Sequence, residues 1–226
     1  MEIVNHTENV KTKHGRRSIR LKEYDYSREG AYFVTICLQD KECLLGEAIE
    51  SKTVLNDAGE MVEKWWSVLP EKYSTISLDE YIIMPNHMHG IIIINGPSVS
   101  VGADQCVCPT DYPTRKNREM IKSKHIGLPL RGLPQHMQWF KTMTTNEYIR
   151  NVKNVNWKPF NKRFWQRNYY EHIVRNEDSL DRIREYIINN PMKWQYDREN
   201  PEHIKDKDYD KKWDYIENVI YNNVNP

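Results

Sequence analysis

The sequence predicts an α+β sandwich in which an antiparallel sheet carries helices on one face. Three observations favour this fold class. Short apolar runs rich in β-branched and aromatic residues alternate with stretches of helical periodicity. Two of these runs are separated only by a tight turn, which joins antiparallel strands but not parallel ones. The elements follow in the order strand, helix, strand, strand, helix, strand, with one further helix after them.

The first half of the chain supplies a strand and a helix. Residues 31–38 (AYFVTICL) follow a turn that contains glycine and have the composition of a strand. The next apolar residues recur on one helical face, so they predict a helix that Asn56 or Asp57 caps and Pro70 ends. Because they lie on that face, we expect the tryptophans in the core; the face carries Met61, Val62, Trp65, Trp66 and Leu69.

A hairpin and three further elements complete the predicted fold. Residues 80–84 (EYIIM) and 88–95 (MHGIIIIN) predict two strands joined by a turn at Pro85 and Asn86. Helical spacing over 135–152 and a strand pattern over 169–174 follow. The last helix is expected over 177–190, with Asn176 as its cap and Pro191 ending it. This order suits a ferredoxin-like sandwich with one additional C-terminal helix.

Length and composition limit how the chain is organised. Its 226 residues allow one domain with extensions, and 38% hydrophobic residues support a core while 29% charged residues favour a water-soluble protein. We expect a main domain over 31–194, interrupted by an insertion at about 96–134. A basic segment over 1–30 and a tail over 195–226 flank it. The absence of a membrane-span or signal-peptide pattern predicts a cytoplasmic protein.

The formal net charge of +1 conceals two basic clusters. Either cluster could follow a phosphate backbone, although such runs are commonly solvated faces or loops. The first cluster comprises Lys11, Lys13, Arg16, Arg17, Arg20 and Lys22, and the second, within the insertion, comprises Arg115, Lys116, Arg118, Lys122, Lys124 and Arg131.

Two histidines at the start of the isoleucine-rich strand are the first candidate for chemistry. His87 and His89 are two residues apart, so on a strand they share a face, with their bases roughly 7 Å apart. Two imidazoles in this arrangement can converge on one divalent cation. Alone the pattern is weakly specific, because nearby histidines often only pack or cap.

A tyrosine and an asparagine near the end of the last predicted helix are the second candidate. Tyr186 and Asn190 are four residues apart, so a phenol and an amide oxygen project from one helical face. The alternative for Tyr186 is a helix residue packed at the sheet edge. Among the rivals Tyr148, Tyr169 and Tyr170, Tyr148 is followed four positions later by a valine, which cannot bind metal.

These motifs together resemble the HUH single-tyrosine transposases, specifically the branch of REP-associated tyrosine transposase-like bacterial proteins, also described as IS200-like. His87-Met88-His89 matches the family's His-hydrophobic-His motif. The run Phe164-Trp165-Gln166, the run Tyr170-Glu171-His172 and the segment from Tyr186 to Pro191 resemble the C-terminal signature of that branch. The likeness extends over about residues 16–194, and the insertion and the tail depart from it.

The resemblance implies roles for individual residues. It makes His87 and His89 metal ligands, Tyr186 the nucleophile and Asn190 the third ligand, with Mg²⁺ or Mn²⁺ as the cation. Cleavage of one DNA strand would then leave a 5'-phosphotyrosine and a free 3' hydroxyl, and a later attack by a 3' hydroxyl would rejoin strands.

The expected partner is single-stranded or hairpin-forming DNA, bound by a monomer or homodimer that is nucleoid-associated when bound. The candidate DNA-binding residues are Arg16, Arg17, Arg20, Arg163, Trp165 and Arg167. Trp165 could stack on bases, but a core position is as well supported. Two other functions remain open: a metal-dependent nuclease that uses water and does not need Tyr186, and a DNA-hairpin-binding module that does not cleave.

Overall fold

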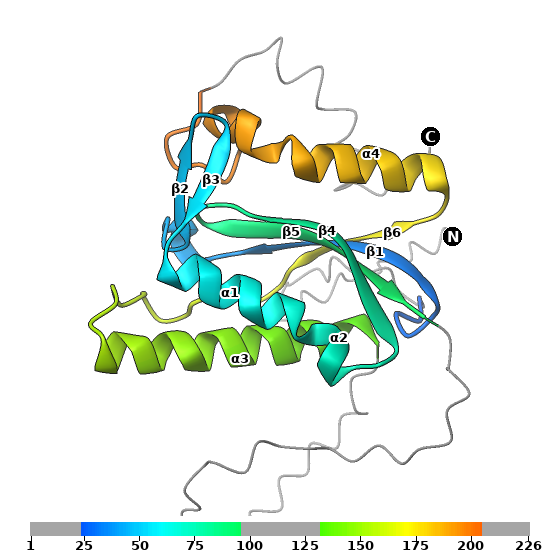
Figure 1. The fold of residues 1–226 in the computed structure, drawn as a ribbon, viewed down its shortest axis with the longest axis horizontal. Coiled ribbons are helices and arrows are strands. Elements are labelled where there is room, and N and C mark those ends of the chain that lie inside the picture. The colour runs from blue at the N-terminus through cyan, green and yellow to red at the C-terminus, as the bar shows by residue number, and fades with distance from the viewer. Residues whose placement is uncertain (1–23, 96–131, 205–226) are drawn as a thin grey trace, which may run out of the picture.

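A four-stranded antiparallel sheet forms the centre of the molecule. The computed structural model describes residues 24–95 and 132–204. The strands lie side by side in the order β4-β5-β1-β6 (Figure 1), and all three pairings between neighbours are antiparallel. Their bounds are Gly30–Cys37 for β1, Ile76–Ile83 for β4, His87–Ile94 for β5 and Tyr170–Val174 for β6.

Helices cover both faces of this sheet. Helices α1 (Asp57–Ser67), α2 (Leu69–Lys72) and α3 (Leu133–Asn154) lie on one face, and α4 (Glu177–Ile188) lies on the other (Figure 1). A short 3-10 helix, η1 (Gln39–Lys41), follows β1. The order β1-α1-β4-β5-α3-β6 and the pairing of the strands confirm the predicted ferredoxin-like α+β sandwich, to which α4 is added.

Strand alternation sends different side chains to the two faces. In β1, Tyr32 and Val34 pack into the core beneath α1 and α3, whereas Phe33 packs with the residues of α4. In β5, Met88 and Ile92 face the first layer, and Ile91 faces α4. Because side chains alternate along a strand, the odd-numbered His87 and His89 also belong to the α4 face. The sequence pattern had predicted a shared face for these histidines without saying which element covers it.

The predicted caps are confirmed at two helices. Asn56 Oδ1 accepts hydrogen bonds from the backbone N–H groups of Ala58 and Gly59, both at 3.0 Å. Asn176 Oδ1 accepts one from the N–H of Ser179 at 2.8 Å. Each bond satisfies a donor at the start of a helix that has no partner within the helix.

The two helices that were predicted to end at prolines do end just before them, α1 at Ser67 and α4 at Ile188. The sequence did not predict that each proline also lies in the first turn of a following helical segment, Pro70 in α2 and Pro191 in a 3-10 helix, η2 (Asn190–Tyr196). Proline is tolerated there, since the first N–H groups of a helix have no partner within the helix. Helix α4 therefore ends at Ile188, and the chain continues as a second helical segment rather than as a loop.

The sequence analysis missed one hairpin. Strands β2 (Gly46–Ile49) and β3 (Lys52–Leu55) pair with each other and are joined by Glu50 and Ser51, whose φ angles are 47° and 64°. Two-residue turns with positive φ normally contain asparagine or glycine, so this turn had no recognisable sequence signature. The hairpin contacts η2 at the same end of the sheet (Figure 1).

Several predicted features fall outside the described residues. They are the basic segment up to residue 23, including Arg16, Arg17 and Arg20, the insertion over 96–131, and the tail from 205. Within the described ranges, no helix has the length and apolar character needed to span a membrane.

Candidate active site

The two histidines of β5 point at each other beneath η2. Both side chains are buried, and their Nε2 atoms are 3.0 Å apart. Ligand atoms about 2.1 Å from an octahedral cation are also about 3 Å apart at neighbouring positions. The pair therefore has the separation that two ligands of one divalent cation require.

Asn86 fixes which nitrogen of His87 carries the proton. The Asn86 amide donates from Nδ2 to the carbonyl oxygens of Lys41 and Glu199, at 3.0 and 2.7 Å. Its Oδ1 must then be the atom 2.9 Å from His87 Nδ1, and an amide oxygen only accepts. His87 Nδ1 is thus the donor, so Nε2 of the neutral ring presents its lone pair to His89.

Thr35 supports His89 from the neighbouring strand. Residues 35 and 89 are register partners in the β1-β5 pair, and Thr35 Oγ1 is 2.8 Å from His89 Nδ1. A hydroxyl can donate or accept, so this partner is compatible with either tautomer. When the hydroxyl accepts, His89 Nε2 is also available as a ligand, which is the second-sphere arrangement typical of metal-binding histidines.

Burial keeps both imidazoles neutral. Loss of hydration lowers the pKa of His87, and the nearby Asp197 and Glu199 carboxylates oppose that effect only in part. The pKa of His89 lies well below its usual value, first because of burial and then because of His87 and Lys193. Neutral rings are the form that binds metal.

A carboxylate that the sequence analysis did not select completes this cluster. Asp197, directly after η2, places Oδ2 3.6 Å from His87 Nε2. One ligand atom each from His87, His89 and Asp197 lie within 4.8 Å of one another, a group suited to a divalent cation. Asp197 was assigned to the tail, and nothing in its local sequence marks it, because it reaches the histidines only through the path of η2.

The structure places Tyr186 beside the histidine pair. It lies in the third turn of α4, is 5% exposed, and its ring centroid is 5.2 Å from that of His89 and 6.1 Å from that of Phe33. Lys193 of η2 holds its Nζ 5.1 Å from the centroid of the Tyr186 ring. A phenol, an ammonium group and a candidate metal centre therefore occupy one region. The rivals Tyr169 and Tyr148 belong to the core on the opposite face.

Asn190 is the first residue of η2 and is buried. Its side-chain Oδ1 has no hydrogen-bond partner among the residues that the structure describes. Leaving a buried amide oxygen unpaired costs free energy, and such an atom is suited to binding a cation. This observation agrees with a ligand role for Asn190, although the helix that was expected to carry it ends two residues earlier.

The candidate DNA-binding residues near position 165 separate into two groups. Trp165 is 4% exposed and donates from Nε1 to Thr144 Oγ1 at 2.8 Å, so it occupies the core and does not present a face for bases. Arg163 and Arg167, on either side of it, are exposed. The sequence allowed Trp165 either to stack on bases or to lie in the core, and in the structure it lies in the core.

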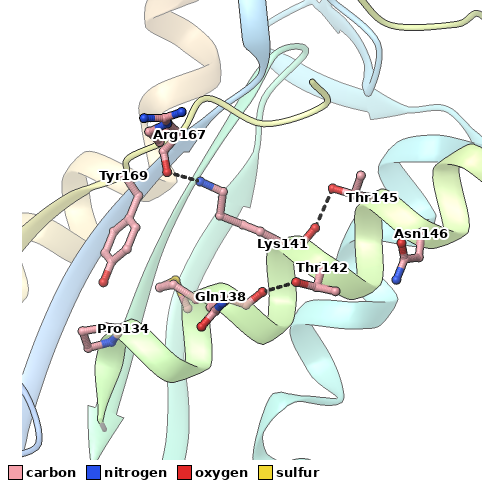
Figure 2. Close-up of a pocket in the computed structure, with 9 residues that line it drawn as sticks. Pro134, Gln138, Lys141, Thr142, Thr145, Asn146, Arg167 and Tyr169 are labelled. Carbon is pink, nitrogen blue, oxygen red and sulfur yellow. Dashed lines mark hydrogen bonds between the residues drawn. The ribbon is translucent and has the colours of Figure 1, made fainter. Parts of the chain in front are cut away.

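Three hollows meet at Arg167. The first, of about 420 Å³, lies along α3 and is lined by Gln138, Lys141 and Tyr169 among others (Figure 2). The second is lined by Thr35, Cys37 and Tyr170 of the sheet and therefore lies beside the histidine site; the third extends to Lys162 and Arg163.

Lys141 holds the loop between these hollows in place. Its Nζ donates to the carbonyl oxygens of Gln166, Arg167 and Asn168, at 2.5, 3.2 and 3.3 Å. Three carbonyl groups on one ammonium group fix the path of the backbone at the point where Arg167 projects (Figure 2).

Comparison with known proteins identifies the family. An uncharacterised protein of Haemophilus influenzae is 40% identical over 185 residues, which are 82% of this chain and 93% of that protein. The family model described as "Transposase IS200 like" matches residues 128–190. This region of the chain is of the IS200-like transposase family. A structure of a REP-associated tyrosine transposase bound to a REP hairpin is 17% identical, with a TM-score of 0.43, and the match covers 76% of this chain and 74% of that one.

The match to the IS200-like transposases covers one part of the site. Residues 128–190 contain Tyr186 and Asn190, whereas the histidines of β5 and Asp197 lie outside the matched range. The fold brings the two parts together, because Ile91 of β5 and Phe33 of the neighbouring strand β1 pack with the buried residues of α4.

Proposed function

We propose that this transposase-family protein nicks and rejoins single-stranded DNA, with Tyr186 as the nucleophile and a divalent cation held at His87 and His89. The observation that carries the proposal is the convergence of two buried imidazoles, 3.0 Å apart at Nε2, beside the ring of a buried tyrosine. A purely structural core seldom gathers these groups, because each must be desolvated.

Three side chains would hold the cation: His87, His89 and Asn190. The second-sphere contacts of Asn86 and Thr35 support this role for the histidines, and the unpaired amide oxygen supports it for Asn190. When bound, Mg²⁺ or Mn²⁺ would offset negative charge on the phosphate and on the departing 3' oxygen. Oxygen donors favour either ion, and the nitrogen donors favour Mn²⁺.

The tyrosine step is a transesterification. The phenol of Tyr186 loses its proton, its oxygen attacks the phosphorus, and the bond from phosphorus to the 3' oxygen breaks. One proton is taken up by that 3' oxygen, which leaves as a hydroxyl, so the step consumes no net proton. The product is a 5'-phosphotyrosine, whose ester bond a later 3' hydroxyl can attack to rejoin strands without ATP. Lys193, with Nζ 5.1 Å from the Tyr186 ring, would stabilise negative charge that develops on the phenol or the phosphate.

The strand would reach this site past Arg167. Arg163 and Arg167 are exposed at hollows that continue to Thr35 and Cys37 on the histidine face. Guanidinium groups beside these hollows can bind successive phosphates. The loop that carries Arg167 is already held in place by Lys141. Arg16, Arg17 and Arg20 would contact the duplex stem of a hairpin substrate, the substrate class that the sequence resemblance implies.

This function belongs to a catalytic domain over 31–194 with a basic N-terminal segment and a C-terminal tail. We propose that it acts as a monomer or homodimer on DNA in the cytoplasm. The alternatives, a nuclease that uses water and a binding module that does not cleave, predict different products in the test below.

The test is covalent capture of DNA by the protein. Wild type, Tyr186→Phe and Tyr170→Phe are incubated with a labelled hairpin carrying a single-stranded flank, with Mn²⁺ or with EDTA, and resolved under denaturing conditions. Tyr170 is the control, because it is an exposed tyrosine at the edge of the same face. We expect a protein-DNA band with wild type and Tyr170→Phe in Mn²⁺, and none with Tyr186→Phe or in EDTA.

Other outcomes would contradict the proposal. Cleavage by wild type and Tyr186→Phe alike, with no covalent band, would indicate a nuclease that uses water. DNA binding without cleavage by any of the proteins would favour the binding module. A covalent band that survives in Tyr186→Phe and disappears in Tyr170→Phe would show that Tyr170 is the nucleophile and that the proposed role of Tyr186 is wrong.

A further inference from the structure

We infer that Asp197 is a direct ligand of the cation, so that a carboxylate from the segment that follows η2 joins His87, His89 and Asn190 in the ligand set. This inference deepens the proposed function and rests on the metal site that it contains. The expected arrangement of two histidines and an amide carries no formal negative charge. Adding a carboxylate changes the charge of the ligand set and therefore its affinity for divalent cations.

The ligand atoms of His87 and Asp197 that face each other are both acceptors. The contacts of Asn86 require the proton of neutral His87 to be on Nδ1, so Nε2 offers a lone pair. Asp197 Oδ2, 3.6 Å from that nitrogen, also offers only lone pairs. Without a cation between them these atoms repel, whereas a cation would satisfy them together.

The other oxygen of the Asp197 carboxylate is already occupied. Oδ1 accepts a hydrogen bond from the backbone N–H of Glu199 at 2.7 Å, which fixes the carboxylate and leaves Oδ2 directed at His87. The side chain is only 12% exposed, so it does not simply project into water as a surface acid would. A carboxylate ligand that is oriented by a backbone donor is the arrangement expected at a metal centre.

The turn that carries Asp197 is bonded to Asn86, the residue that orients His87. Asn86 Nδ2, on the amide that binds His87, donates to the carbonyl oxygen of Glu199 at 2.7 Å. Asn200 Nδ2 donates to the Trp194 carbonyl at 2.8 Å, and Lys41 lies 3.8 Å from the Glu199 carboxylate. The turn is thus positioned by bonds that do not involve the cluster, so the approach of Asp197 to His87 is built into the fold.

The test compares Asp197→Asn with Glu199→Gln. Asparagine at 197 can still accept the bond from the Glu199 N–H, so the turn is kept while the ligand oxygen facing His87 becomes an amide nitrogen. Glu199→Gln removes the same charge from the same turn, but Glu199 is not part of the cluster whose atoms converge. Mn²⁺ binding is measured by calorimetry and by electron paramagnetic resonance, with folding checked by circular dichroism in EDTA.

We expect Asp197→Asn to weaken Mn²⁺ binding at least about tenfold and Glu199→Gln to weaken it less than about twofold. Equal losses in the two variants would overturn the inference, because the effect would then be general electrostatics. Mn²⁺ binding by Asp197→Asn as tight as that of wild type would also overturn it. If wild type and His87→Ala bind Mn²⁺ equally weakly, the metal site itself fails, and with it the proposed function; this outcome is distinct from a loss confined to residue 197.

Discussion

The two histidines are held by partners of different chemistry. The amide of Asn86 is committed by its own donors, so it fixes one tautomer of His87. The hydroxyl of Thr35 can donate or accept, so His89 can adjust. In a site built this way one candidate ligand stays oriented, and the other could change tautomer if a cation bound.

Removing the Thr35 hydroxyl tests this view of the site. Thr35→Val keeps the branched shape on β1 but deprives His89 Nδ1 of its partner. We expect Mn²⁺ affinity to fall between about tenfold and a hundredfold, the usual effect of losing a second-sphere contact. The measurement is a calorimetric Mn²⁺ titration.

Thr53→Val on β3 is the control, since Thr53 Oγ1 donates its hydrogen bond to the sulfur of Met84, at 3.5 Å, and not to a histidine. Unchanged Mn²⁺ affinity in Thr35→Val would contradict a supporting role for the hydroxyl. An equal loss in both variants would indicate a general effect of replacing threonine.

At this scale the sequence predicted what depends on local periodicity. His87 and His89 were expected to share a face because side chains alternate along a strand, and they do. Asn86 was assigned only to a turn, and Asp197 only to the tail. Their roles depend on bonds between residues about 110 positions apart, such as that between Asn86 and Glu199, and no local pattern encodes such bonds.

At the scale of single elements, α3 carries a buried histidine distant in sequence from the histidine pair of β5. His136 lies in its first turn, its ring centroid is 4.5 Å from that of Tyr73, and its Nδ1 has no partner among the described residues. Burial lowers the pKa of His136 to about 4. The folded protein therefore binds a proton at this position less readily than the unfolded chain, whose histidine pKa is 6.5.

This difference predicts that His136 makes stability depend on pH. The unfolded state binds more protons between pH 6.5 and about 4, so the free energy of unfolding falls as pH decreases through that window. The contribution of this residue is about 3 kcal/mol at full extent. The control variant is His136→Phe, which keeps a ring against Tyr73. As pH falls through this window, the free energy of unfolding of wild type should decrease by about that much more than that of the variant.

Urea unfolding at pH 7, 5.5 and 4 measures this effect. The other histidines are the same in both proteins. The difference between the two plots of unfolding free energy against pH therefore isolates residue 136. Curves that stay parallel over this range would show that the folded and unfolded states bind protons equally at His136, contrary to the expectation.

The elements themselves were predicted where an apolar pattern was long. Helix α3 and the hairpin of β4 and β5 were recognised, with bounds that differ by a few residues. Strands β2 and β3 were missed because they have only four residues each and their turn uses Glu50 and Ser51. Helix η2 was missed because Pro191 was expected only to end a helix, whereas it also lies in the first turn of the next one.

For the molecule as a whole, the balanced charge limits how it can bind DNA. A formal net charge of +1 provides little long-range attraction, so phosphate contacts must come from local groups. Exposed Arg163 and Arg167 are such groups within the described residues. Binding should therefore depend on a few identifiable contacts and respond to single substitutions.

Arg167→Gln provides the corresponding prediction. Removing one phosphate contact should reduce the salt dependence of single-strand binding, with the slope of log affinity against log salt changing by about 0.7. Arg150→Gln is the control, because Arg150 is an exposed residue of α3 that pairs with Glu147 at 3.7 Å. Fluorescence anisotropy at several salt concentrations gives both slopes. Equal slopes for wild type and Arg167→Gln would contradict a phosphate contact at this residue.

The fold class followed from the order of elements, since six recognisable segments in the order β-α-β-β-α-β allow few arrangements of an antiparallel sheet. The order of elements does not predict that α4 covers the sheet face opposite α1 and α3. That position depends on the packing of Leu180, Ile183 and Ile187 against Phe33 and Ile91, residues brought together only by the complete sheet.

The most direct test of the central claim is to identify the residue that carries the DNA. The covalent complex formed in Mn²⁺ is treated with nuclease and protease, and mass spectrometry locates the peptide with an added 5'-linked nucleotide. The account predicts the modification on Tyr186, within the α4 peptide. Modification of any other residue, or strand cleavage without a modified peptide, would contradict it.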